Sequence, residues 1–127
     1  MGRYSFGQIV LAPVVDGTPD KNPKDRPCVI ISKNTENDAG EDFLIIPITK
    51  DIPNPCPFYN IIIPHDNESR KITRLKYYSV AKCNWAFEIP QQRIIRPFGQ
   101  MLDDTLLLII TAYDAILRDP AFNWILY

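Results

Sequence analysis

One arginine and one threonine of this sequence are spaced so that they can act together on a phosphate group. Arg26 precedes Pro27 at the start of one apolar run, and Thr49 closes the next apolar run along the chain. An arginine at the start of one strand and a threonine at the end of the next can face a shared groove. The guanidinium would grip two phosphate oxygens and the hydroxyl would donate a hydrogen bond. We therefore expect Arg26 and Thr49 to converge on a solvent-open cleft.

The residue types do not identify the proton acceptor, because a threonine hydroxyl is a poor base unaided. His65 is the only histidine, and the ordinary titration range of histidine suits proton transfer. It lies in a turn-like Pro-His-Asp-Asn segment, which is also typical of a plain surface histidine. Asp20 and Asp25, in the loop before Arg26, are the other candidates, and either can instead pair with Arg26 in a structural ion pair.

The basic residues are concentrated in the middle of the chain, although the net charge of −1 does not indicate a nucleic-acid-binding protein. Ten of the 14 Lys and Arg residues fall between positions 21 and 82, and four of them fall within residues 70–76. This distribution predicts a local basic face on a nearly neutral molecule. A solvated charged surface without a ligand is the alternative.

Composition and length predict a single globular domain over residues 1–127. Hydrophobic residues make up 46% of the chain and charged residues 23%, which is ordinary for a globular protein. Three cysteines without close spacing, together with one histidine, do not predict a zinc site, and we expect no metal and no cofactor. Cys28 and Cys83 lie in apolar runs and are expected to be buried thiols. The sparse cysteines, the lack of a signal-peptide pattern and apolar runs too short to cross a bilayer predict a cytoplasmic protein with no membrane contact.

Short apolar runs separated by the 12 prolines predict an all-β body. The expected strands are residues 8–12, 27–32, 43–49, 58–63, 77–83 and 93–95. Residues 14–25, 33–41 and 51–57 are expected to be loops or turns. Pro13 is expected to stop the first strand, and Pro47 indicates an edge or a bulge in the third.

A change of period after residue 101 predicts a helix. Apolar residues recur at 106, 110, 113 and 117, which is helical spacing on a broad face. Asp103 or Asp104 would be its N-cap, and Pro120 marks its end. The apolar tail, residues 122–127, would need a docking surface. Several short strands followed by one terminal helix predict a small antiparallel barrel or half-barrel.

Five segments, in order, resemble the PemK/MazF family of toxins from bacterial toxin–antitoxin pairs. The resembling segments are FGQIV at 6–10, KDRPCVIIS at 24–32, IPIT at 46–49, SVAK at 79–82 with IPQQRI at 89–94, and LDD at 102–104 before the helix. The resemblance implies a homodimer with a src-homology-3-like barrel and a C-terminal helix. It also implies a sequence-selective, metal-independent endoribonuclease (an mRNA interferase), with RNA near the dimer groove and a cognate antitoxin as partner. The family's catalytic pair falls on Arg26 and Thr49.

The resemblance also implies which side chains bind single-stranded RNA. Expected RNA-binding residues are Lys24, Lys50, Arg70, Lys71, Arg74, Lys76 and Trp85. The basic ones would hold the phosphate backbone. Residues 84–87 (NWAF) replace a step of the family that usually carries a basic residue, and Gln8 replaces the family's opening acid. Trp85 could compensate by stacking on a base, or it could be a core or dimer-interface tryptophan.

Two other functions are compatible with the same barrel. One is a non-enzymatic toxin similar to the CcdB gyrase poisons, which act through a protein interface and the end of the terminal helix. The apolar segment 123–127 permits this function. The other is a catalytically silent barrel that binds RNA or protein, a reading that the low net charge and the altered segment 84–87 favour.

Overall fold

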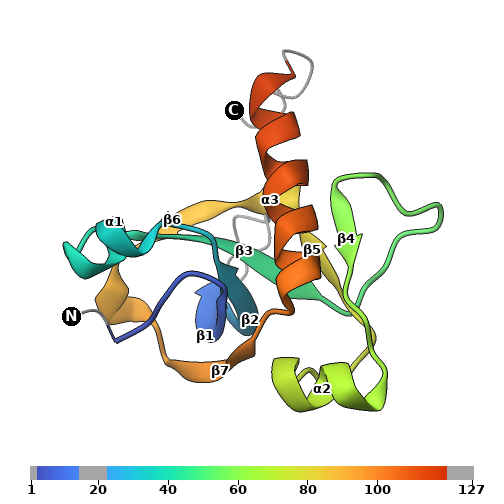
Figure 1. Cartoon of the computed structure of the whole chain (residues 1–127), viewed down its shortest axis with the longest axis horizontal. Helices are drawn as coiled ribbons and strands as arrows, with labels where there is room; N and C mark the ends of the chain where they lie inside the picture. The colour runs from blue at the N-terminus through green and yellow to red at the C-terminus, as the bar shows by residue number, and fades with distance from the viewer. Residues whose placement is uncertain (1–2, 15–22, 120–127) are drawn as a thin grey trace.

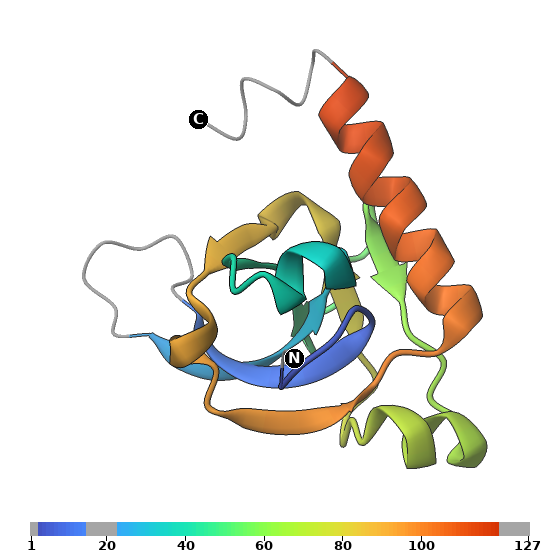
Figure 2. The ribbon, with the colours of Figure 1, turned by 60° about the vertical axis from the view of Figure 1, so that its left-hand side comes forward.

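Seven antiparallel strands form the body of the protein in the computed structural model, which describes residues 3–14 and 23–119 (Figure 1). The strands are β1 Gln8–Val14, β2 Lys24–Ile30, β3 Phe43–Thr49, β4 Asn60–Ile62, β5 Val80–Lys82, β6 Phe87–Ile89 and β7 Arg96–Gln100. Their order across the sheet is β4-β5-β3-β2-β1-β7, and β6 also pairs with β3. In the described part of the chain β4 and β7 do not pair, so the expected barrel is an open, curled sheet (Figure 2).

Three α-helices and two short 3-10 helices surround this sheet. They are α1 Asn34–Asp38, α2 Asn67–Thr73, η1 Cys83–Trp85, η2 Gln91–Arg93 and α3 Asp103–Arg118. Helix α3 lies outside the curl of the sheet, and α2 lies beside β7 at the opposite end of the molecule from α1 (Figures 1 and 2). No helix in the described ranges is long and apolar enough to cross a bilayer.

Strand β3 and the apolar parts of β1 and β2 have both of their faces buried. Alternate residues of β1, β2 and β3 enter two different clusters. Ile9 and Ile46 pack in the cluster that includes Ile109 of α3, whereas Val10 and Ile45 pack in the cluster on the other face. This two-sided burial explains continuous apolar runs in place of the strict alternation of a half-exposed sheet. Cys28 and Cys83 are buried, as predicted.

The predicted C-terminal helix is confirmed as α3, but its N-cap differs from the prediction. Leu102 occupies the cap position, and Asp103 and Asp104 lie in the first turn. There the two carboxylates face the positive end of the helix dipole, so they favour the helix start without capping it. The helix ends at Arg118, two residues before Pro120. The tail, residues 122–127, lies outside the described residues.

Two prolines sit inside strands at places where the pairing pattern tolerates them. The prediction that Pro13 stops the first strand is wrong, since β1 continues to Val14 and Pro13 pairs with Asp25. Strand β7 pairs with β1 only as far as Leu11, so one side of Pro13 needs no ladder hydrogen bond. Pro47 lies in a central strand, between the β3 residues that pair with β6 and those that pair with β5. Pro47 therefore does not mark an edge of the sheet, and it lies where β3 changes its partner strand from β6 to β5.

Several predicted boundaries and types are also wrong. Strand β2 begins at Lys24, so the preceding loop is shorter than residues 14–25. Strands β4 and β5 are shorter than residues 58–63 and 77–83. Residues 93–95 are not a strand, because a 3-10 turn ends at Arg93 and β7 begins only at Arg96. The expected turn at 33–41 contains α1, which is anchored by the buried Asn37: its Nδ2 donates to the carbonyl of Ser32 at 3.0 Å.

Helix α2 was not anticipated, because it is short and carries no apolar stripe. Asp66 caps it: the carboxylate accepts the backbone N–H of Ser69 at 3.3 Å and the Ser69 hydroxyl at 2.6 Å. These hydrogen bonds hold the pKa of Asp66 below its ordinary value. At its other end the helix stops at Arg74, whose backbone is left-handed with φ 64°.

Candidate functional site

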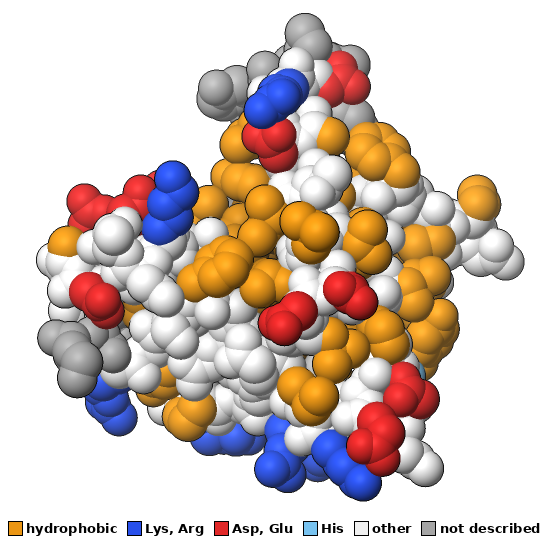
Figure 3. All heavy atoms as spheres, in the orientation of Figure 1, with side chains coloured by type: hydrophobic (Ala, Val, Ile, Leu, Met, Phe, Trp, Pro, Cys, Tyr) orange, Lys and Arg blue, Asp and Glu red, His pale blue; other side chains and the backbone are white. Residues whose placement is uncertain are grey.

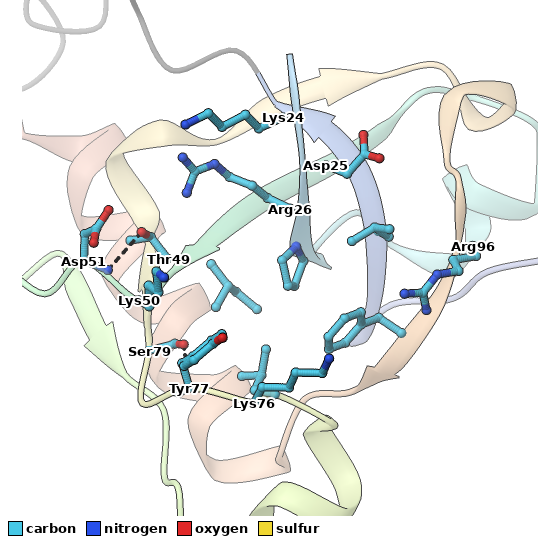
Figure 4. Close-up of a pocket in the computed structure, with 15 residues that line it drawn as sticks. Lys24, Asp25, Arg26, Thr49, Lys50, Asp51, Lys76, Tyr77, Ser79 and Arg96 are labelled. Atoms are coloured by element: carbon cyan, nitrogen blue, oxygen red, sulfur yellow. Dashed lines mark hydrogen bonds between the residues drawn. The ribbon is translucent and has the colours of Figure 1, made fainter. Parts of the chain in front are cut away.

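Arg26 and Thr49 line one open cleft of about 500 Å³, as their spacing predicted (Figure 4). Strands β1, β2, β3 and β7 and the segment between α2 and β5 form its walls. Its polar and charged lining residues and its one tyrosine are Lys24, Asp25, Arg26, Thr49, Lys50, Asp51, Lys76, Tyr77, Ser79 and Arg96. The cleft therefore holds five Lys or Arg side chains and two Asp side chains among the described residues, a balance that attracts anions.

Strand register explains why the arginine and the threonine meet. Cys28 of β2 pairs with Pro47 of β3 in an antiparallel ladder. Continuing that register by two residues sets Arg26 opposite Thr49, and directly opposite residues project from the same face of a sheet. Figure 4 shows the Arg26 side chain extending to the side of the cleft that holds Thr49 and Asp51.

The Thr49 hydroxyl is held in place by the chain that follows it. Thr49 is 7% exposed, and its Oγ1 accepts the backbone N–H of Asp51 at 3.1 Å. A hydroxyl has one donor hydrogen and two acceptor lone pairs. Because the Asp51 N–H occupies a lone pair, the hydroxyl hydrogen remains able to donate to an oxygen in the cleft.

Other cations of the cleft are supported by aromatic and polar neighbours. The Nζ of Lys50 lies 4.8 Å from the centre of the Tyr77 ring, in cation–π geometry. The Ser79 hydroxyl donates to the Tyr77 carbonyl at 2.7 Å, which fixes the segment entering β5. These contacts hold Lys50 and Tyr77 at the same wall as Thr49 (Figure 4).

Of the predicted site residues, the structure brings some into the cleft and leaves others elsewhere. Lys24, Asp25, Lys50 and Lys76 line it together with Arg26 and Thr49. Arg70, Lys71 and Arg74 line a separate open depression of about 520 Å³ along α2, which Lys76 also lines. Asp20 lies outside the described residues.

His65 and Trp85 are not among the residues that line the cleft. His65 is half-buried beside Tyr78, with ring centres 6.2 Å apart. Trp85 is 43% exposed, so its interpretation as a core tryptophan is wrong. The Nζ of Lys82 lies 3.9 Å from the centre of the Trp85 ring, and burial lowers the pKa of Lys82 while the nearby Asp51 carboxylate opposes that change.

Two charged residues of the cleft were not predicted from the sequence. Asp51 follows Thr49 by two positions, and that proximity to Thr49 was the one available signal. Arg96 had no local signal, because its strand was misplaced by three residues and it reaches the cleft only through the pairing of β7 with β1 at Leu11. Within the described ranges, no group of three His, Cys, Asp or Glu residues is arranged to hold a metal ion.

Comparison with known proteins gives one family and one fold. Residues 5–116 match the model of a family described as PemK-like, MazF-like toxin of type II toxin–antitoxin system. Among solved structures, MazF from Deinococcus radiodurans is 13% identical, with a TM-score of 0.71 over 91% of this chain and 97% of that chain. The Mycobacterium tuberculosis toxin MazF-mt6 is 19% identical, with a TM-score of 0.67 over 88% of this chain and 98% of that chain.

A third similar structure is an endoribonuclease from a mycobacterial species in complex with its cognate antitoxin. It is 14% identical, with a TM-score of 0.69 over 92% of this chain and 97% of that chain. At these identities the three structures establish the shared fold. No curated protein sequence matches this chain.

Proposed function

This chain belongs to the PemK-like, MazF-like toxins of type II toxin–antitoxin systems, and we propose that it is an endoribonuclease whose catalytic pair is Arg26 and Thr49. The proposed reaction is metal-independent, sequence-selective cleavage of single-stranded RNA. The observation that carries the proposal is the convergence of the Arg26 guanidinium and the Thr49 hydroxyl on one open, cation-rich cleft.

RNA supplies its own nucleophile for this reaction. The 2′-oxygen attacks the adjacent phosphorus, the bond between phosphorus and the 5′-oxygen breaks, and the products are a 2′,3′-cyclic phosphate and a free 5′-hydroxyl. The 2′-hydroxyl loses a proton to an acceptor, and the departing 5′-oxygen gains one. The protein therefore needs to orient the attack, stabilise the charge on the pentacoordinate phosphorus and move two protons.

Arg26 and Thr49 suit the charge-stabilising part of this work. The positively charged, planar guanidinium of an arginine can bind two phosphate oxygens at once. The Thr49 hydroxyl, oriented by the Asp51 N–H, can donate to a phosphate oxygen. Both groups lie in place before the substrate arrives, which is the arrangement that stabilises developing charge most effectively.

Asp51 is the carboxylate best placed to accept the proton of the 2′-hydroxyl. Two carboxylates line the cleft, and in Figure 4 Asp51 lies on the side of Thr49 and the Arg26 side chain, whereas Asp25 points away from Arg26. We therefore assign proton transfer to Asp51 rather than to Asp25 or His65.

The proposal includes three further features. The partners are single-stranded RNA, a cognate antitoxin and a second copy of the chain in a homodimer. Leu107 and Leu108 of α3 are 66% and 55% exposed and offer an apolar surface for such a copy. Three free cysteines suit the reducing cytoplasm, where the RNA substrate is found.

The test is incubation of the purified chain with single-stranded RNA in excess EDTA. Cleavage into fragments with 2′,3′-cyclic phosphate and 5′-hydroxyl ends is expected, with loss of cleavage in Arg26→Ala and Thr49→Ala. Lys33→Ala, which removes an exposed charge beside α1, serves as the control. Intact RNA with folded wild-type protein would refute the proposal.

The two alternative functions give different results in the same assays. Bound but uncleaved RNA would indicate a catalytically silent barrel. Toxicity that survives Arg26→Ala but disappears when residues 122–127 are deleted would indicate a non-enzymatic toxin. That tail lies outside the described residues.

A further inference from the structure

A second depression of about 500 Å³ adjoins the catalytic cleft on the β7 side. Lys76, Arg96 and Phe98 line both hollows, so the two surfaces are continuous. The second depression adds Arg74, at the end of α2, to the cations of the cleft. We call the surface formed by Lys76, Arg96 and Arg74 the β7–α2 track. In Figure 3 Lys and Arg side chains gather along the lower edge of the molecule, where Figure 1 places β7 and α2.

The β7–α2 track differs from its neighbours in having no carboxylate among its described lining residues. The catalytic cleft contains Asp25 and Asp51, and the depression along α2 contains Glu68, which bonds Lys71 at 3.2 Å. No ion pair joins Lys76, Arg96 or Arg74 to a carboxylate in the part of the chain that the structure describes. Their positive charge is therefore available to an anion from solution.

The backbone conformation of Arg74 supports a binding role for its side chain. Arg74 adopts φ 64° and ψ 12° as the C-cap of α2, and its N–H donates to the carbonyl of Arg70. Glycine fits this left-handed position best, and a residue with a Cβ is strained there. A strained position occupied by a charged residue on an open cationic surface supports a binding role for that residue.

The β7–α2 track also depends on a close approach between the backbone of β7 and the end of α2. A Cβ added to Gly99 of β7 would lie 2.1 Å from the carbonyl oxygen of Thr73, the last residue of α2. Only glycine allows the helix end to approach the strand this closely. The contact places Arg74 beside the strand that carries Arg96.

We propose that the β7–α2 track binds the phosphodiester backbone of the RNA on one side of the cleaved phosphate. In this arrangement the strand leaves the catalytic cleft past Lys76, Arg96 holds one phosphate where the two hollows meet, and Arg74 holds the next phosphate in the second depression. The inference rests on the proposed function, since it takes RNA as the ligand. It adds Arg96 to the RNA-binding residues and predicts that affinity grows with RNA length on one side of the cleavage site only.

The experiment measures binding of RNAs that carry 2′-O-methyl groups at the cleavage site and therefore stay intact. A core oligonucleotide is compared with versions extended by four nucleotides on the 5′ side or on the 3′ side. Wild-type protein is expected to gain roughly tenfold affinity from one extension. Arg74→Ala/Arg96→Ala should lose that gain, and the slope of log K against log salt for the extended RNA should decrease by about 1.4, or about 0.7 for each phosphate contact.

The matched control is Lys33→Ala/Arg118→Ala, which removes two exposed positive charges from α1 and from the far end of α3. The control variant should keep the gain in affinity from the extension. That result would distinguish binding at the β7–α2 track from a general effect of net charge. Circular dichroism checks that both double variants are folded.

Three results of the RNA-binding series would overturn the inference. They are an equal gain from both extensions, a gain that survives Arg74→Ala/Arg96→Ala, and a gain lost equally in the control. Binding of an acidic 12-residue peptide that the double variant loses, with RNA affinity unchanged, would assign the surface to a protein and also overturn it. Failure of the wild type to cleave unmodified RNA is a separate result, which refutes the proposed function. The core and extended oligonucleotides then need no 2′-O-methyl groups, and their binding still tests the track.

Discussion

The hydroxyl oxygen of Thr49 accepts a hydrogen bond from the backbone N–H of Asp51 at 3.1 Å. One short segment after β3 therefore both orients the hydroxyl and places a carboxylate beside it (Figure 4). The oriented hydroxyl can therefore donate a hydrogen bond into the cleft, whose described lining includes five cationic side chains.

Replacing Thr49 by valine tests the donor directly, because valine keeps the shape and removes the hydroxyl. Thr49→Val should lower kcat for RNA cleavage by about 10²–10³-fold, the usual effect of losing one transition-state donor. Thr49→Ser restores the hydroxyl and should recover most of the rate. Initial rates on a fluorogenic RNA measure both, and wild-type rates in Thr49→Val would show that the hydroxyl is not used.

Asp51→Asn tests the proton acceptor. The amide cannot take the proton of the 2′-hydroxyl, so kcat should decrease by about 10²–10⁴-fold. Asp25→Asn is the matched control, since Asp25 lines the same cleft but points away from Arg26 in Figure 4. A larger loss in the Asp25 variant would assign the proton transfer to Asp25 of β2 instead.

Gly99→Ala should destabilise the contact between α2 and β7. The new Cβ would lie 2.1 Å from the Thr73 carbonyl oxygen, so the free energy of unfolding should decrease by about 1–3 kcal/mol as the helix end is displaced. Urea titration measures the loss, and faster amide exchange in α2 would locate it. Gly40→Ala is the comparison, because Gly40 has positive φ but no atom within 4 Å of the added Cβ. A smaller loss in Gly99→Ala than in Gly40→Ala would contradict the steric argument.

The Asp66 cap should make part of the stability depend on pH. Hydrogen bonds from Ser69 lower the pKa of Asp66 in the folded state below the ordinary value of 3.8. A lowered folded-state pKa contributes stability that is complete above 3.8 and is lost as the pH falls through the folded-state value. Asp66→Ala should therefore reduce the urea midpoint at pH 7, and the difference from wild type should narrow as the pH falls below 3.8 and the carboxylate becomes protonated.

Asn67→Ala, at the first residue of α2, is the control for the cap. It removes no titratable group, so any change in its midpoint should be similar at both pH values. A difference between Asp66→Ala and wild type that stays constant down to acid pH would mean that the carboxylate charge does not stabilise α2.

The three thiols should differ in reactivity in the native protein. Burial raises the pKa of Cys28 and of Cys83 to about 12, so neither forms appreciable thiolate at pH 8. Cys56 is only partly buried. Ellman's reagent should react quickly with one thiol in native protein and with three in denaturant, and Cys56→Ser should abolish the fast phase. Rapid reaction of more than one native thiol would show that Cys28 or Cys83 is exposed by local opening.

The elements that local pattern determines were predictable. The apolar runs that became β2 and β3 are continuous because both faces are buried, and the period of α3 is set by its packing on the sheet. The short elements were not predictable in the same way. Strand β7 has only five residues, and its pairing with β1 rather than its own composition makes it a strand.

The sequence by itself determined that Arg26 begins one apolar run and that Thr49 ends the next, because an apolar run depends only on the order of residues along the chain. Only the tertiary structure decided which other groups reach the same cleft. Arg96 reaches the cleft from a strand remote in sequence, Asp51 lies on the Thr49 side of the cleft, and His65 and Trp85 are not among its lining residues. The physical reason is that an apolar run is a local property of the chain, whereas strand register and the composition of a cleft depend on how separate segments pack against one another.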